Sequence, residues 1–163
     1  MTGNGGTRRR VLGLDLGLTT TGWAYLGGEG EIRVVESGTL RPGGRRDGER
    51  LAWFREMVDE VVDRYKPGEV ALEDYILGQA RRNPRTLASS AELGGVVKAI
   101  LAAYAVPVRL WGPSAWRKQV FGRDMKKEEV VEEAGRRWGW EARWADEVEA
   151  MCIARASWER GAP

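Results

Sequence analysis

The sequence predicts a single α/β domain built on a mixed five-stranded sheet with helices on both faces. Three strand-like segments follow one another near the start of the chain and are separated by glycine-containing turns. Two further strand-like segments come later, and each follows a longer segment whose apolar residues recur at helical spacing. The 163 residues suffice for one hydrophobic core but not for two. We therefore treat residues 1–163 as one domain and expect residues 1–9 to be flexible.

The first three strands are expected to pair as an antiparallel meander. Val11–Leu16 is almost entirely apolar, which is typical of a buried strand. The small residues 17–22 form a turn that leads into the second strand at Trp23–Leu26. Gly27–Gly30 supplies the next turn, and Ile32–Leu40 gives the third strand.

Helices and strands are expected to alternate in the middle of the chain. Apolar residues keep helical spacing from Leu51 to Tyr65, and the strand Val70–Leu72 follows after a Lys-Pro-Gly stop. The same order repeats with a helix whose apolar face runs from Leu93 to Tyr104 and a strand at Val106–Leu110. Strands joined through helices in this way lie parallel in one sheet.

Three more helices are expected to complete the domain. Pro113–Val120 begins with a proline, which favours the first turn of a helix. Lys126–Trp138 and Trp144–Trp158 follow. A three-stranded meander, two further strands joined through helices and a final helix describe the ribonuclease H-like arrangement. The arrangement alone does not establish a function.

Composition limits the possible chemistry. The chain has no histidine, which excludes a Ser-His-Asp triad and any zinc site that depends on imidazole. Its single cysteine, Cys152, cannot form a disulfide within the chain and is expected to be a buried thiol in a reducing cytoplasm. No apolar run approaches the roughly 18 residues that span a bilayer, so we expect a soluble cytoplasmic protein with no membrane partner. Because the chain has no histidine, any catalysis would have to depend on carboxylates.

Net charge gives no reason to expect a nucleic-acid partner, because 26 basic residues nearly balance 24 acidic ones. The basic residues are nevertheless clustered along the chain, although an ordinary solvated surface explains any one cluster equally well. The clusters comprise Arg8, Arg9 and Arg10; Arg81, Arg82 and Arg85 in one loop; and Arg117, Lys118, Arg123, Lys126 and Lys127.

Four carboxylates are the candidate catalytic residues. Asp15 lies near the end of the first apolar strand, where an uncompensated buried charge would be costly. Glu73 ends the fourth strand in the same way, and the topology places that strand beside the first. Asp146 and Glu149 are three residues apart and so project from one face of the last helix. We expect all four to share one site.

Such an oxygen-only site suits Mg²⁺ or Mn²⁺, and two ions about 4 Å apart can hold the attacking water and the leaving oxygen of a phosphoryl displacement. Each acid also has a simpler explanation. Asp15 could form a turn before Gly17, and Glu73 could be a solvated strand-end acid. Asp146 could be a helix cap or a first-turn acid, and it and Glu149 could simply be solvated. Only the joint order of the four along the chain favours a metal site.

At these residues the sequence resembles the RuvC family of Holliday-junction resolvases over nearly its whole length. Val11–Trp23 resembles the family's opening motif, Ala71–Glu73 its second acidic motif and Ala145–Ala154 its closing helix. The resemblance implies a homodimeric, Mg²⁺-dependent endonuclease that cuts four-way DNA by paired nicks, encoded by a bacterium or a phage. It also implies that Asp15, Glu73, Asp146 and Glu149 are the metal ligands. The family usually carries Asp where Glu149 stands, so ligand geometry or metal preference is expected to differ here.

The resemblance also implies DNA contacts and a dimer interface. Ala91–Lys98 is similar to the family helix that builds the twofold dimer, although Gly94 and Gly95 could instead let this helix lie close to its own sheet. Tyr75 or Ile76 would be the wedge at the branch point, with Tyr75 favoured because aromatic rings stack on bases, unless both simply pack in a loop.

Basic residues are the expected contacts to the DNA backbone. The segments 116–122 and 126–130 resemble the family's two basic segments, and Lys118 and Lys127 are the expected phosphate contacts. A register shift of one residue would place Arg117 or Lys126 there instead. Arg81, Arg82 and Arg85 are further expected DNA contacts.

Two rival functions remain at this stage. Leu14–Gly22 also resembles the phosphate loop of actin-like ATP-binding proteins, but these need two such lobes, and the acids of the last helix would have no role in them. The other rival is a nucleic-acid binding or processing module that acts on other branched DNA or on RNA.

Overall fold

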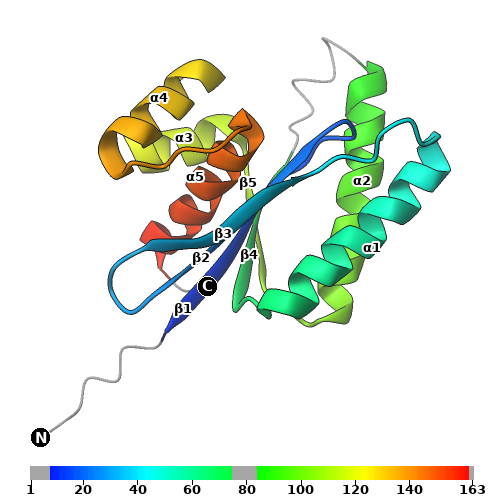
Figure 1. The fold of residues 1–163 in the computed structure, drawn as a ribbon, viewed down its shortest axis with the longest axis horizontal. Coiled ribbons are helices and arrows are strands. Elements are labelled where there is room, and N and C mark those ends of the chain that lie inside the picture. The colour runs from blue at the N-terminus through cyan, green and yellow to red at the C-terminus, as the bar shows by residue number, and fades with distance from the viewer. Residues whose placement is uncertain (1–7, 75–83, 162–163) are drawn as a thin grey trace, which may run out of the picture.

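The computed structural model describes residues 8–74 and 84–161 and is organised around a five-stranded mixed sheet of order β3-β2-β1-β4-β5 (Figure 1). The strands are β1 (Arg9–Asp15), β2 (Thr21–Gly28), β3 (Arg33–Leu40), β4 (Glu69–Glu73) and β5 (Val108–Trp111). β1, β2 and β3 pair antiparallel, while β4 and β5 add in parallel beyond β1. The predicted meander, the parallel strands and the ribonuclease H-like fold class are confirmed.

Helices cover both faces of this sheet, as predicted (Figure 1). α1 (Asp47–Tyr65) and α2 (Pro84–Ala103) lie on one face. α3 (Pro113–Phe121), α4 (Lys127–Trp138) and α5 (Ala145–Arg160) lie on the other. The predicted ends of the strands and helices differ from the observed ones, most at the start of α2, which begins nine residues before the predicted apolar face.

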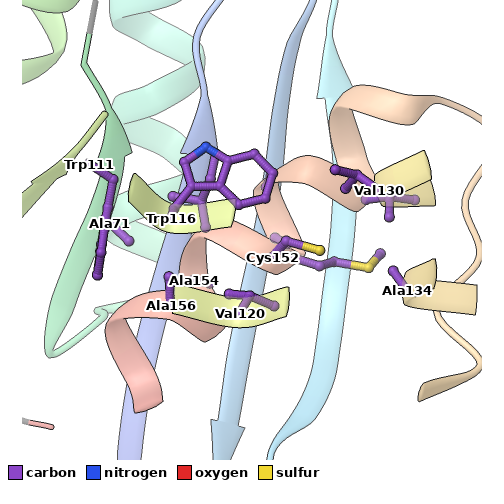
Figure 2. Close-up of a cluster of buried hydrophobic side chains, with 14 of the residues drawn as sticks. Ala71, Trp111, Trp116, Val120, Val130, Ala134, Cys152, Ala154 and Ala156 are labelled. Carbon is purple, nitrogen blue, oxygen red and sulfur yellow. The ribbon is translucent and has the colours of Figure 1, made fainter. Parts of the chain in front are cut away.

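The core on the α5 side is built from aromatic and small aliphatic side chains. Trp116 is fully buried there, together with Cys152 and alanines of α5 (Figure 2). The expectation of a buried cysteine is confirmed, and burial raises the pKa of the Cys152 thiol well above its ordinary value. A buried neutral thiol is a poor nucleophile, so Cys152 has a packing role.

Two glycines let α5 lie directly on the sheet. A Cβ atom on Gly13 of β1 would overlap the backbone carbonyl oxygen of Ala150, and one on Gly22 of β2 would overlap that of Asp146. Glycine is the only residue that permits so close an approach of two backbones. The first turns of α5 are therefore held beside the carboxyl end of β1, where Asp15 lies.

α2 packs its inner face on the sheet through the fully buried Leu93, Val97 and Leu101. Within residues 8–74 and 84–161 it is the one helix that is long and apolar enough, by length and composition alone, to cross a membrane, a test that core helices also pass. Gly94 and Gly95 do not contact the sheet, since a Cβ atom at either would meet nothing within 4 Å. The explanation of these glycines as sites of close helix-to-sheet approach is therefore wrong.

Candidate metal centre

The four predicted acids line one cavity of about 290 Å³ at the carboxyl ends of β1 and β4. Asp15 and Glu73 are the last residues of these two neighbouring parallel strands. Asp146 and Glu149 come from the first two turns of α5, which the glycines of β1 and β2 hold against the sheet. The N-cap of α5 is Trp144, so the explanation of Asp146 as a helix cap is wrong, whereas its alternative place as an acid of the first turn is confirmed.

Three of these acids form the tightest group. Carboxylate oxygens of Asp15, Asp146 and Glu149 all lie within 4.8 Å of one another. Glu73 lies at the same cavity but outside this group, and its carboxylate accepts a hydrogen bond of 2.6 Å from the indole Nε1 of Trp116. Hard cations such as Mg²⁺ prefer oxygen ligands of this kind.

Ionisation of the acids in this cavity is costly. Burial raises the pKa of Asp15 well above its ordinary value, and the negative charges of Glu149 and Glu73 raise it further. Burial also raises the pKa of Glu73, although the hydrogen bond from Trp116 partly offsets the shift. Several like charges at one buried place need a cation nearby, or protons, to be stable.

Lys127, the first residue of α4, provides that cation within the protein. Its ammonium Nζ pairs with Asp146, with Glu149 Oε2 at 2.5 Å and with Asp15 Oδ2 at 3.9 Å. Burial alone would lower the pKa of Lys127, but the hydrogen bonds to Asp146 and Glu149 raise it above the ordinary value. A positive charge thus already lies among the oxygens that could hold a metal ion, which shows that the donor set suits a cation.

Arg117 rather than Lys118 reaches the cavity from α3. The guanidinium of Arg117 lies 3.2 Å from Glu149 Oε1, whereas Lys118 is exposed and does not line the cavity. The phase of the helix explains the difference. Arg117 lies one turn after Pro113, which also lines the cavity, while Lys118 is rotated about 100° further round the helix.

The other predicted DNA contacts are distributed differently. Arg85 lies in the first turn of α2 rather than in a loop and lines an adjoining cavity. Four expected contacts fall outside the described residues: Tyr75, Ile76, Arg81 and Arg82.

Two acids next to the predicted ligands take no part in the group. Asp74, next to Glu73, pairs with Lys98 at 3.6 Å. Glu147, next to Asp146, accepts a hydrogen bond of 3.2 Å from Ser37. Both therefore serve contacts away from the cluster of Asp15, Asp146 and Glu149.

The contact of Trp116 with Glu73 was not predicted. Its side chain is fully buried, and the N–H group of a buried tryptophan must find a partner. An indole in the helix next to the acidic site could have suggested that partner. The sequence alone does not indicate which acid it binds.

Comparisons with known proteins find relatives over most of the chain. The family model described as crossover junction endodeoxyribonuclease RuvC matches residues 11–136, which include Asp15, Glu73, Arg117 and Lys127 but not α5. The enzyme of that name from Nitratidesulfovibrio vulgaris Hildenborough is 33% identical over 122 residues, covering 74% of this chain and 72% of the relative.

Solved structures show the same fold. The structure of Thermus thermophilus RuvC superposes with a TM-score of 0.79 at 23% identity, covering 92% of this chain and 93% of the other. T. thermophilus RuvC in complex with a Holliday junction substrate superposes with a TM-score of 0.78 at 21% identity, covering 93% of each chain. In both comparisons the alignment covers nearly all of each chain.

Proposed function

The chain belongs to the RuvC family of crossover junction endodeoxyribonucleases, and on that premise we propose that it resolves Holliday junctions as a structure-selective DNA endonuclease. The observation that carries the proposal is the convergence of Asp15, Asp146 and Glu149 within 4.8 Å, with Glu73 at the same cavity. A structural relative has been solved with a Holliday junction substrate, which supports four-way DNA as the substrate of this chain.

In this proposal Asp15, Glu73, Asp146 and Glu149 hold Mg²⁺, two ions per site, with Mn²⁺ as a possible substitute. When bound, the metal supplies Lewis-acid stabilisation of the phosphate and a water of lowered pKa. The protein keeps its oxygen ligands in place before the metal binds: Trp116 orients Glu73, and the backbone contact of α5 with β2 orients Asp146. Preorganised ligands lower the cost of binding.

Arg117 and Lys127 are proposed to reduce the electrostatic repulsion between the acidic cavity and the DNA backbone. A phosphodiester carries its own negative charge, and four carboxylates alone would repel it. The two cationic side chains line the same cavity and reduce that repulsion. In hydrolysis the water oxygen forms a new bond to phosphorus, the bond to one bridging oxygen breaks, and that oxygen leaves with a proton.

The decisive test is Asp15→Asn. This variant is expected to lose junction cleavage in Mg²⁺ by at least about a thousandfold, because it removes a charged ligand, while it still binds the junction. Asp74→Asn is the matched control, because Asp74 pairs with Lys98 away from the cluster. This variant should cleave junctions at the wild-type rate. Nicking of junctions by Asp15→Asn would refute the site assignment.

We also propose that the protein is a homodimer, as two coordinated nicks require, and that it works in the cytoplasm of a bacterium or of a phage host. The outer face of α2 supports the dimer, because Ala91, Gly95, Ala99 and Ala102 are exposed there with open space at Gly95. Small residues on an apolar helix allow a second helix to approach closely. A twofold contact through α2 would present two sites to one junction.

ATP binding is the less favoured candidate. The hydroxyl of Thr21 donates to the carbonyl of Gly17 at 2.9 Å and accepts from the amide of Gly17 at 3.2 Å, so these groups of the β1–β2 loop bind each other. A titration with ATP and Mg²⁺ is expected to show no binding. Cleavage of four-way junctions, Y-forks, duplex DNA and RNA side by side tests the third candidate, a module for other nucleic acids.

A further inference from the structure

A second cavity of about 510 Å³ adjoins the carboxylate cavity. The two share Gly17, Thr20 and Asp146 as lining residues, so they lie next to each other at the carboxyl edge of the sheet. The second cavity extends between the β1–β2 loop and the first turns of α1 and α2. None of the predicted metal ligands except Asp146 lines it.

The charge of the second cavity is opposite to that of the first. Arg50 from α1 and Arg85 from α2 line it, and Asp146 is the one acid among its described lining residues. Among the side chains that the structure describes, which do not include Asp47 of α1, neither arginine has an ion pair with a carboxylate. Arg50 is half-buried, donates to the carbonyl of Arg45 at 3.1 Å and has a buried Nε that lacks a hydrogen-bond partner within the described part of the chain.

Neutral donors add to the two cations. Hydroxyl groups reach the lining from the β1–β2 loop and from α2, among them those of Thr19 and Ser89. The 20-residue helix α2 begins at this cavity and has no acidic residue in its first turn. The unpaired amides and the dipole at the start of a helix favour an anion.

We propose that this cavity binds a backbone phosphate of the same DNA strand, next to the phosphate that is cut in the carboxylate cavity. The inference rests on the proposed nuclease function and adds to it a subsite that holds the strand in register. Two guanidinium groups, hydroxyls and a helix start are the donors that phosphate oxygens accept from. The shared wall allows one strand to pass from one cavity to the other.

Binding of a four-way junction in Ca²⁺, without cleavage, tests the proposal. Arg50→Gln and Arg85→Gln are each expected to weaken junction binding about tenfold. Each should also reduce by about 1 the slope of the logarithm of the association constant against the logarithm of the salt concentration. Arg55→Gln is the matched control, since Arg55 is exposed on α1 and lines neither cavity. It should leave both quantities unchanged, and thermal melting would show that all three variants fold.

Neutral methylphosphonate linkages, placed one at a time beside the cleavage site, identify the phosphate. The wild type is expected to lose about tenfold in affinity at one flanking position, and Arg85→Gln to lose nothing further there. In one outcome the wild type cleaves the junction, while Arg50→Gln and Arg85→Gln lose as much affinity as the wild type does at every methylphosphonate position. That result would refute the subsite and leave the proposed nuclease function intact. If the wild type neither binds nor cleaves junctions, the proposed function is refuted together with the subsite.

Discussion

Lys127 pairs with three of the four acids in the metal-free site, whereas Arg117 pairs with Glu149 alone among them. The ammonium of Lys127 pairs with Asp15, Asp146 and Glu149, so a metal ion and Lys127 compete for the same oxygens. We predict that Lys127→Met destabilises the metal-free protein by about 1–2 kcal/mol, less than for a fully buried pair because the lysine is 41% exposed. The same change should tighten Mn²⁺ binding, measured by isothermal titration calorimetry.

Lys126→Met is the control for this prediction, because Lys126 is exposed beside Lys127 and does not line the cavity. It should change neither the free energy of unfolding nor the metal affinity. If Lys127→Met binds Mn²⁺ no more tightly than the wild type does, then the lysine leaves the oxygens at no cost and does not compete.

The raised pKa values of Asp15 and Glu73 predict a pH dependence of metal binding. A carboxyl whose pKa is raised in the fold contributes stability below its unfolded pKa, near 4, and loses that contribution as pH rises through the folded value. Protons therefore still compete with the metal for these two carboxylates at pH values above the ordinary carboxylate pKa. Mn²⁺ affinity should therefore continue to increase as the pH is raised above the ordinary carboxylate pKa, near 4.

The variant that isolates this effect is Asp15→Asn, which removes the more strongly shifted carboxyl. Its Mn²⁺ affinity should be weaker and should vary less over the same pH range. At neutral pH its metal-free form should unfold at a higher temperature than the wild type, because a buried charge is gone. A wild-type affinity that is constant across the range would contradict the prediction.

At the scale of strands and helices, the pairing of Asp15 with Glu73 can be predicted because each ends an apolar segment and parallel neighbours end at the same edge. The approach of α5 cannot be predicted this way. It depends on Gly13 and Gly22, whose role appears only when the backbone of α5 lies against them. Likewise the choice of Arg117 over Lys118 depends on which face of α3 is turned toward the cavity, and the correctly predicted start at Pro113 does not give that face.

Gly13→Ala tests the contact between β1 and α5. The added Cβ would overlap the backbone carbonyl of Ala150 and crowd Ala154, and backbone cannot move aside as a flexible side chain can. We predict a loss of about 2–4 kcal/mol in the free energy of unfolding, measured by urea denaturation. Metal affinity should fall as well, because α5 carries Asp146 and Glu149.

Gly44→Ala is a suitable control for that experiment, since a Cβ atom there would meet nothing within 4 Å. Its effect on the free energy of unfolding should stay within about 0.5 kcal/mol. A Gly13→Ala protein as stable as this control would show that α5 does not lie directly on β1.

At the scale of the whole molecule, the two cavities lie at one edge of the sheet and the small-residue face of α2 lies outside the core. The start of α2 lines the second cavity, while its later turns carry Gly95. The helix proposed to join two subunits therefore also reaches the proposed phosphate subsite. A dimer built on α2 would fix the distance between two such sites, as coordinated cleavage of a symmetric junction requires.

Gly95→Arg tests this link between assembly and activity. The fold should tolerate the change, because a Cβ at Gly95 meets no other atom and arginine favours a helix by about 0.8 kcal/mol over glycine. A large charged side chain at a close helix contact should separate the dimer, seen as a halved mass in light scattering. Junctions should then be nicked on single strands without the paired cut.

Ala115→Arg is the control, because Ala115 is exposed on α3, in the other helical layer, and this variant should keep the wild-type mass. If the Gly95→Arg protein also keeps the wild-type mass, the dimer interface lies elsewhere.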